Sequence, residues 1–319
     1  MKTENELIQE MMRLGYNPLT TGYQNETESE KGNYNFRYWN LPMDNGKLKG
    51  GPFYYEREND FAHLTSLDKL FAILESKTIR LYNLINMDDR FEMEYGVLEL
   101  GFPSIEQILE QKKDLFCISM CSFNELDNDI VKEHLLWRLY GSSGNGVILR
   151  LAFKNDRHFW QQYHLSEVYY DTNQFQNVKE LHSFKGRNYF DPKIASFLKR
   201  DIYSFENEAR LIFDNRKNNV TATVMDKDEK IIYPIIKADN KNPGVSFLSL
   251  PLTNFYQTNA EFMGLAYANE WEYKIPKISI EEIILGYRFS KEQHASAIEK
   301  IRSFDSSIKV STTKLRKYY

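Results

Sequence analysis

The sequence predicts an α+β fold, and three observations support that prediction. Helical and strand patterns follow one another without the regular alternation that is typical of a doubly wound parallel sheet. Hydrophobic residues make up 42 % of the 319 residues and charged residues 27 %. This composition excludes collagen-like, mucin-like and wholly disordered proteins. A chain of this length also buries enough surface to fold without a disulfide or a metal staple.

The composition changes at Phe53, which sets the expected domain organisation. Residues 1–52 are polar and rich in Asn, Glu, Thr and Gly, so we expect an N-terminal extension there that is partly flexible. A short helix is expected at residues 5–14 and a flexible stretch at residues 19–33. Residues 53–319 are expected to form a single α+β domain.

The first structured unit is expected to be a strand, a helix and a second strand. Ser66 follows a short strand pattern and is a suitable N-cap. Apolar residues then recur at helical spacing up to Lys77, and residues 79–82 alternate as a strand does. Further strands are expected at residues 115–121, 147–153, 168–170, 206–213, 231–236, 280–285 and 308–311, and further helices at residues 128–140, 191–205 and 291–304.

A glycine-rich run, GSSGNG, occupies residues 141–146. A phosphate-binding loop follows a strand and opens a helix, whereas this run follows a helix and opens a strand. The order of elements therefore favours a tight turn with close backbone approach, and contact with a ligand stays as the alternative.

Glu206, Glu208 and Arg210 form the most pointed chemical pattern. If they lie on one strand, their side chains share a face and the two carboxylates are about 6.5–7 Å apart. Two such carboxylates could perform acid–base chemistry or stabilise a cationic transition state. The alternative is an ordinary Glu–Arg ladder on the surface, which contributes a few tenths of a kcal/mol.

Two further pairs of polar residues lie on expected strands. His63 and Thr65 share one strand face and could bind a sugar hydroxyl or an amide, although a single histidine is also common in a core. Ser119 and Ser122 flank Cys121 in an otherwise apolar strand. A buried serine needs a partner, so each is expected to bind either backbone or a ligand.

Cysteine usage and hydropathy indicate a soluble, reduced, cytoplasmic protein without a membrane partner. No apolar stretch approaches the length that crosses a bilayer, and the first twelve residues do not resemble a secretory signal. Cys117 and Cys121 would lie about 13 Å apart on a strand, too far for a disulfide. No histidine or cysteine spacing typical of a metal site is present, so no metal is expected.

Basic residues gather at residues 185–200 and 288–319, although the formal net charge is −4. Such clusters can bind nucleic acid, or they can be ordinary solvated surface.

Several spaced motifs resemble the bacterial family named domain of unknown function 2971. They are HLTSL from residue 63, DDRFE at 88–92, SMCSF at 119–123, LWRLYG from residue 136, GVILRLAF from residue 146, VYY at 168–170, Lys199 with ENEAR to residue 210, and IILG from residue 283. The resemblance spans residues 60–315. Residues 88–92 depart from the family's NDPxE motif, and Tyr203 replaces the tryptophan that precedes its ExExR motif. The family has no settled activity.

A second resemblance, to ADP-ribosyltransferase-like toxins, supplies a chemistry. These enzymes carry a His or Arg on a first strand, a hydroxyl on a second, and a terminal E-x-E, which His63 with Thr65, Ser119 with Ser122, and Glu206 with Glu208 resemble in order. The resemblance implies a split β-sheet core with flanking helices and NAD as co-substrate. It implies that Glu208 holds the ribose and Glu206 activates the acceptor. His63, Thr65, Ser119, Ser122 and Arg210 would bind NAD.

Three functions follow from these patterns. The first is an NAD-dependent ADP-ribosyltransferase, acting as a toxin or an anti-phage defence effector on a protein or nucleic-acid acceptor. The second is a nucleic-acid-binding protein or a metal-dependent nuclease that uses Asp88, Asp89 and Glu92. The third is a non-catalytic sensor module. The sequence leaves the acceptor and the oligomeric state open.

Overall fold

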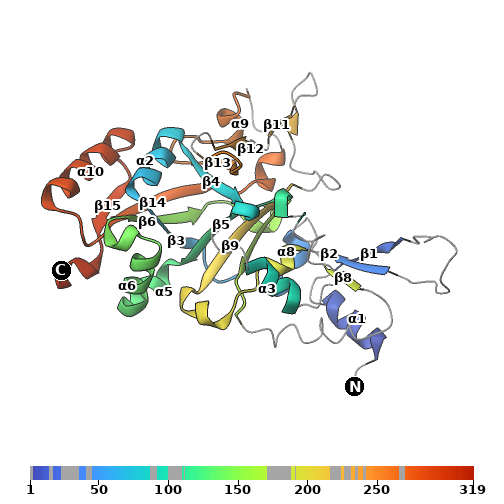
Figure 1. The fold of residues 1–319 in the computed structure, drawn as a ribbon. Coiled ribbons are helices and arrows are strands. Elements are labelled where there is room, and N and C mark those ends of the chain that lie inside the picture. Colours follow the sequence, from blue (N-terminus) through green and yellow to red (C-terminus); the bar gives the residue numbers. More distant parts are fainter. Residues whose placement is uncertain are drawn as a thin grey trace.

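The computed structural model describes residues 3–13, 17–22, 36–40, 45–86, 92–99, 110, 112–170, 188–190, 192–215, 224–225, 231–233, 236–239, 242–265 and 270–319. Its centre is a ten-stranded sheet with helices packed around it (Figure 1), which confirms the α+β class. The main path runs β12 (Ile236–Ala238), β13 (Ser246–Pro251), β4 (Thr78–Asn83), β5 (Leu115–Ser122), β3 (Asp60–Thr65), β6 (Val147–Phe153), β14 (Ile278–Leu285) and β15 (Lys309–Thr312). Only the β14–β15 pair is parallel among the pairs of this sheet that the structure describes.

Strand β5 is the branch point of the sheet. Along one edge it pairs with β9 (Glu208–Asp214), which in turn pairs with β7 (Tyr163–Glu167). Its other edge is shared, because β4 pairs with Phe116 and Cys117, while β3 pairs with Cys121 and Ser122. The sheet is therefore divided at the middle of β5, where β3 and β4 separate (Figure 1).

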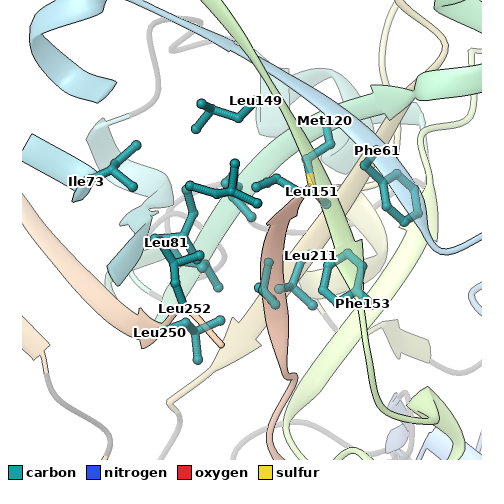
Figure 2. Close-up of a cluster of buried hydrophobic side chains, with 14 of the residues drawn as sticks. Phe61, Ile73, Leu81, Met120, Leu149, Leu151, Phe153, Leu211, Leu250 and Leu252 are labelled. Carbon is teal, nitrogen blue, oxygen red and sulfur yellow. The ribbon is translucent and has the colours of Figure 1, made fainter. Parts of the chain in front are cut away.

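The two faces of the sheet bury different hydrophobic clusters. Ala209, Leu211 and Phe213 of β9 belong to the largest cluster, together with side chains of α2 (Leu67–Ser76) and α10 (Lys291–Phe304). Figure 2 shows part of this cluster, with Leu149, Leu151, Leu211, Phe61 and Phe153 among its labelled side chains. Because side chains alternate along a strand, Glu208 and Arg210 project from the opposite face of β9.

The second cluster extends the packed core beyond the expected boundary at Phe53. Leu7 and Met11 of α1 (Glu4–Arg13) are fully buried in it, beside Ile194 and Ile212. In addition, β1 (Asn17–Gly22) pairs with β2 (Phe36–Asn40), and β2 pairs in parallel with β8 (Asn188–Phe190). The polar first 52 residues therefore contribute both core side chains and strands. Most of the stretch expected to be flexible, residues 23–33, lies outside the described residues.

One expected helix is broken in the structure, and the expected strand at residues 168–170 is a single bridge. The helix expected at residues 128–140 is confirmed as α6 (Ile130–Leu139), which Asp129 caps, and a short helix that the sequence did not predict, α5 (Phe123–Asn128), precedes it. The expected helix 191–205 is reduced to α8 (Pro192–Ala195) and a 3-10 helix, η7 (Asp201–Glu206). Between these two, the Tyr169 N–H donates to the Phe197 carbonyl, and the Lys199 N–H donates to the Tyr169 carbonyl. This bridge holds residues 197–199 in an extended conformation.

The remaining described elements are short and lie around the sheet. They are α3 (Glu92–Glu99), α9 (Asn259–Phe262), β10 (Val224–Met225), β11 (Ile231–Tyr233), η1 (Asn45–Leu48), η2 (Leu84–Asn86), η3 (Lys112–Asp114), η4 (Ser142–Gly144), η5 (Arg157–Phe159), η9 (Glu270–Lys274) and η10 (Lys314–Tyr318). Within the described part of the chain, no helix has the length and apolarity needed to span a bilayer.

The glycine run at residues 141–146 folds as a tight turn, as its position between a helix and a strand predicts. Gly144 has a φ of +91°, and a Cβ there would lie 2.5 Å from the Tyr287 ring. A Cβ at Gly146 would lie 2.4 Å from the carbonyl oxygen of Thr65. Backbone geometry therefore explains both glycines.

We expect Gly144→Ala to lower the free energy of unfolding by more than the approximately 1 kcal/mol that an unfavourable φ alone costs. The additional loss comes from the contact with Tyr287. Gly244→Ala is a matched control, because Gly244 has a φ of +92° and open space around its Cβ position. Urea denaturation of both variants measures the difference. Equal losses in the free energy of unfolding would show that the Tyr287 ring moves aside without destabilising the fold.

Candidate active site at the start of strand β9

A cluster of buried charged side chains lies where η7 leads into β9. Glu206 and Glu208 are 5 % and 7 % exposed, and Lys199 and Arg210 are 8 % and 1 % exposed. Burying a charge is unfavourable unless it is paired, and here two carboxylates are matched by two cations. Such a concentration of buried charge within residues 199–210 marks a candidate functional site.

Lys199 connects the two carboxylates. Its Nζ lies 2.6 Å from Oε2 of Glu206 and 3.0 Å from Oε2 of Glu208. Arg210 binds Glu208 through two hydrogen bonds, from Nε to Oε1 at 2.7 Å and from Nη2 to Oε2 at 3.0 Å. Burial raises the pKa of Glu208, but the charges of Arg210 and Lys199 outweigh that effect and lower the pKa to about 2. Glu208 is therefore ionised throughout the physiological pH range.

Two phenols complete the cluster. The Tyr140 hydroxyl donates to Oε1 of Glu206, and the Tyr170 hydroxyl accepts a hydrogen bond from the backbone N–H of Glu208 at 3.0 Å. Burial and the bond to Glu206 raise the pKa of Tyr140, and burial and the nearby Glu208 charge raise that of Tyr170. Both phenols therefore stay protonated at neutral pH. Tyr140 is 47 % exposed, so the cluster reaches the molecular surface at this residue.

Asn207 places the two carboxylates. It has a φ of +42°, a left-handed conformation that asparagine adopts more readily than most residues. Its side-chain amide donates to Oε2 of Glu125 at 2.6 Å, which fixes this turn. Glu206 therefore lies at the end of η7 and not on β9, which corrects the expectation that both carboxylates share a strand face.

Ser119 of β5 lies at the cluster. His63 lies on β3, along the edge of β5 that is opposite β9. Ser119 is the register partner of Arg210, so their side chains share a face of the sheet. His63 Nδ1 lies 2.9 Å from the Ser119 carbonyl oxygen, in the gap where β3 and β4 separate. By strand alternation His63 shares the face of Phe61, opposite that of Glu208. Burial lowers the pKa of His63, so its ring is neutral at pH 7.

Thr65 and Ser122, the other two candidates, have structural positions. The Ser122 hydroxyl accepts the backbone N–H of Glu125 at 3.2 Å and so caps α5. Thr65 is buried at the opposite end of β3, paired with Val147. The structure thus joins Glu206, Glu208, Arg210 and Ser119, and it does not bring Thr65 or Ser122 to them.

Lys199, Tyr140 and Tyr170 are members of the cluster to which the sequence assigned no role. Each lies within a motif that resembles the family, and this position is the sequence feature that could have indicated a role for it. Their convergence depends on tertiary contacts. The bridge at Tyr169 places Lys199 and Tyr170 together, and the end of α6 supplies Tyr140.

The basic cluster at residues 185–200 is largely unavailable to phosphates in its described part. Lys193 and Lys199 are buried in ion pairs, with Asp214 and with the two glutamates respectively. Lys185 and Arg187 lie outside the described residues, as do Asp88 and Asp89 of the nuclease hypothesis. Glu92 begins α3. Among the described residues, no group of three His, Cys, Asp or Glu could hold a metal ion.

Comparison of the chain with protein-family models, curated proteins and solved structures gives no match.

Proposed function

We propose that the chain is an NAD-dependent ADP-ribosyltransferase-like enzyme whose catalytic centre is the charged cluster at the start of β9. The observation that carries this proposal is the position of Lys199, whose ammonium lies between two buried carboxylates. The position of this ammonium suits the positive charge that develops on ribose when the bond between nicotinamide and ribose breaks. Stabilising such charge by fixed groups is usually the largest contribution to the rate.

The reaction assigns different roles to the two carboxylates. The bond between nicotinamide and ribose C1′ breaks, and nicotinamide leaves with the bonding electron pair. Glu208, held ionised by Arg210, stabilises the cationic ribose. The acceptor nucleophile forms a bond to C1′, and its proton passes to Glu206. Lys199 has to move away from the carboxylates, and the Tyr203 ring, 5.0 Å from its Nζ, offers a neighbouring position for the ammonium.

The proposal modifies the site that the sequence predicts. Glu206, Glu208, Arg210 and Ser119 keep their roles, and Lys199 and Tyr140 are added. Thr65, Ser122 and His63 are not required, since two are outside the cluster and His63 faces the other side of the sheet.

Nicotinamide release from NAD by the full chain tests this proposal. We expect Glu206→Gln to reduce the rate by a factor on the order of 10²–10³. Tyr140→Phe removes only the hydroxyl that binds Glu206, and we expect a loss of about tenfold or more with the fold preserved. Tyr273→Phe, at an exposed tyrosine outside the cluster, is the matched control.

Two results would contradict the proposal. The first is a native-like chain that releases no nicotinamide, and the second is a Tyr140→Phe variant as active as the Tyr273→Phe control. Mass spectrometry of added protein and of added DNA or RNA, incubated with the chain and NAD, identifies which class of acceptor gains ADP-ribose.

A further inference from the structure

A cavity of about 530 Å³ lies outside the charged cluster, between the segment after η1 and the end of β6. Its volume is within the range of small-molecule sites in proteins. The lining residues are Lys49, Tyr54, Tyr55, Glu56, Asn59, Phe153, Lys154, Asn155, Asp156 and Arg157. The cavity is independent of the proposed catalytic centre.

Arg157 is the buried cation of this cavity, and it lacks a carboxylate partner among the described residues. It is 8 % exposed. Its guanidinium donates to the carbonyl oxygens of Tyr55 and Glu58, the latter at 2.6 Å, and to the side-chain oxygen of Asn59. All three acceptors are neutral, and the Asp156 and Glu56 carboxylates act on this charge only from beyond ion-pair distance, so an anion bound in the cavity would stabilise it further. Burial accordingly lowers the pKa of Arg157.

The same hydrogen bonds make the cavity wall rigid. They hold the chain at residues 55–59, and the Tyr55 and Phe153 rings both pack on Phe61, with centroids 5.1 Å and 5.5 Å away. The Asn155 side chain is fixed by Trp160 and by the Lys277 N–H. A preformed wall lowers the entropic cost of binding a ligand.

The charges at the exposed rim balance one another. Lys49 and Lys154 stand there with Glu56 and Asp156, and Lys154 Nζ also lies 2.6 Å from Oε1 of Glu281, so the preference for an anion comes from Arg157. Tyr54 is partly exposed and supplies aromatic surface on which a planar ring can stack, whereas Tyr55 and Phe153 are buried against Phe61.

We propose that this cavity binds a small organic anion that carries a planar ring, with the anionic group near Arg157 and the ring against Tyr54. The anionic group is a phosphate monoester or a carboxylate.

Isothermal titration of the full chain with adenosine 5′-monophosphate, benzoate, ribose 5-phosphate and adenosine separates the contributions of the anionic group and of the ring. We expect adenosine 5′-monophosphate, benzoate or both to bind, and the one that binds identifies the anionic group. If adenosine 5′-monophosphate binds, ribose 5-phosphate, which has no planar ring, and adenosine, which has no charge, should each bind at least tenfold more weakly.

Variants at the rim test the location without removing Arg157, which holds the wall. Tyr54→Ala should weaken the binding of the probe about tenfold or more, since stacking on an aromatic ring is lost. Lys49→Glu should weaken it several-fold and reduce its dependence on salt. Lys47→Glu is the control, because Lys47 is exposed on η1, two residues before Lys49, and does not line the cavity.

The proposal is overturned if neither anionic ring probe binds at millimolar concentration, or if Tyr54→Ala and Lys49→Glu bind as well as Lys47→Glu. It is also overturned if Tyr140→Phe weakens binding while Tyr54→Ala does not, since that result would place the probe at the catalytic cluster. Loss of nicotinamide release in Tyr140→Phe with unchanged probe binding separates the two sites.

Discussion

Glu208→Gln is expected to lower the free energy of unfolding by about 3–5 kcal/mol, the usual effect of removing one partner from a buried ion pair. The amide keeps the shape of the side chain but leaves Arg210 and Lys199 with a single carboxylate between them. Urea denaturation at pH 7 measures the loss. Glu167→Gln is the matched control, because Glu167 pairs with Arg57 at the surface and should cost less than about 1 kcal/mol.

The same variant has a distinctive dependence on pH. The pKa of Glu208 is lowered from 4.5 to about 2 in the folded chain. A lowered pKa contributes stability above the unfolded pKa, and this contribution is lost as the pH falls from about 4.5 towards 2. Wild-type protein should therefore lose more stability over this range than Glu208→Gln does. If the free energy of unfolding of the two proteins changed with pH in parallel, the contacts of Glu208 with Arg210 and Lys199 would not stabilise the fold.

A large folding effect also limits what Glu208→Gln can show about catalysis. An inactive variant that is several kcal/mol less stable could owe its inactivity to unfolding. Tyr140→Phe avoids this difficulty, because Tyr140 is half-exposed and its ring remains in place. The free energy of unfolding of Glu208→Gln and the nicotinamide release by Tyr140→Phe are therefore two separate measurements on the same cluster.

Elements with strong local signals were predicted closely from the sequence. The expected strand at 147–153 and helix at 291–304 coincide with β6 and α10, and Ser66 caps α2 as expected. In these cases the apolar spacing and the capping residue lie within the element itself. Tertiary contacts add little to what the local pattern already specifies.

The contents of the charged cluster could not be predicted in the same way. Lys199 has the sequence surroundings of an exposed lysine, and it is buried because the backbone bridge at Tyr169 ends the preceding helix early. The Tyr140 hydroxyl reaches the Glu206 carboxylate across 66 residues of sequence, and the Tyr170 hydroxyl reaches the Glu208 backbone N–H across 38. The E-x-E pattern therefore identified the two acids, and the non-local contacts determined their partners.

Lys193→Met is expected to have the second large effect on stability. Lys193 Nζ lies 2.9 Å from Oδ2 of Asp214, and neither side chain is more than 1 % exposed. The ammonium also lies 3.3 Å from Nε2 of His164. Methionine fills a similar volume but leaves the Asp214 carboxylate buried without this cation, so a loss of about 3–5 kcal/mol is expected. Lys113→Met, at an exposed pair with Glu110, should change stability by less than about 1 kcal/mol.

The double variant Lys193→Met/Asp214→Leu decides what the buried pair contributes. Both charges are then absent, and the backbone groups of Asp214 keep their hydrogen bonds to Gln162. If burying the two charges costs about as much as their attraction returns, the double variant should recover most of the loss seen in Lys193→Met. Urea denaturation of the three variants measures this recovery. A double variant as unstable as Lys193→Met would show instead that the ion pair itself, with the neighbouring His164, stabilises the packing of α8 against β9.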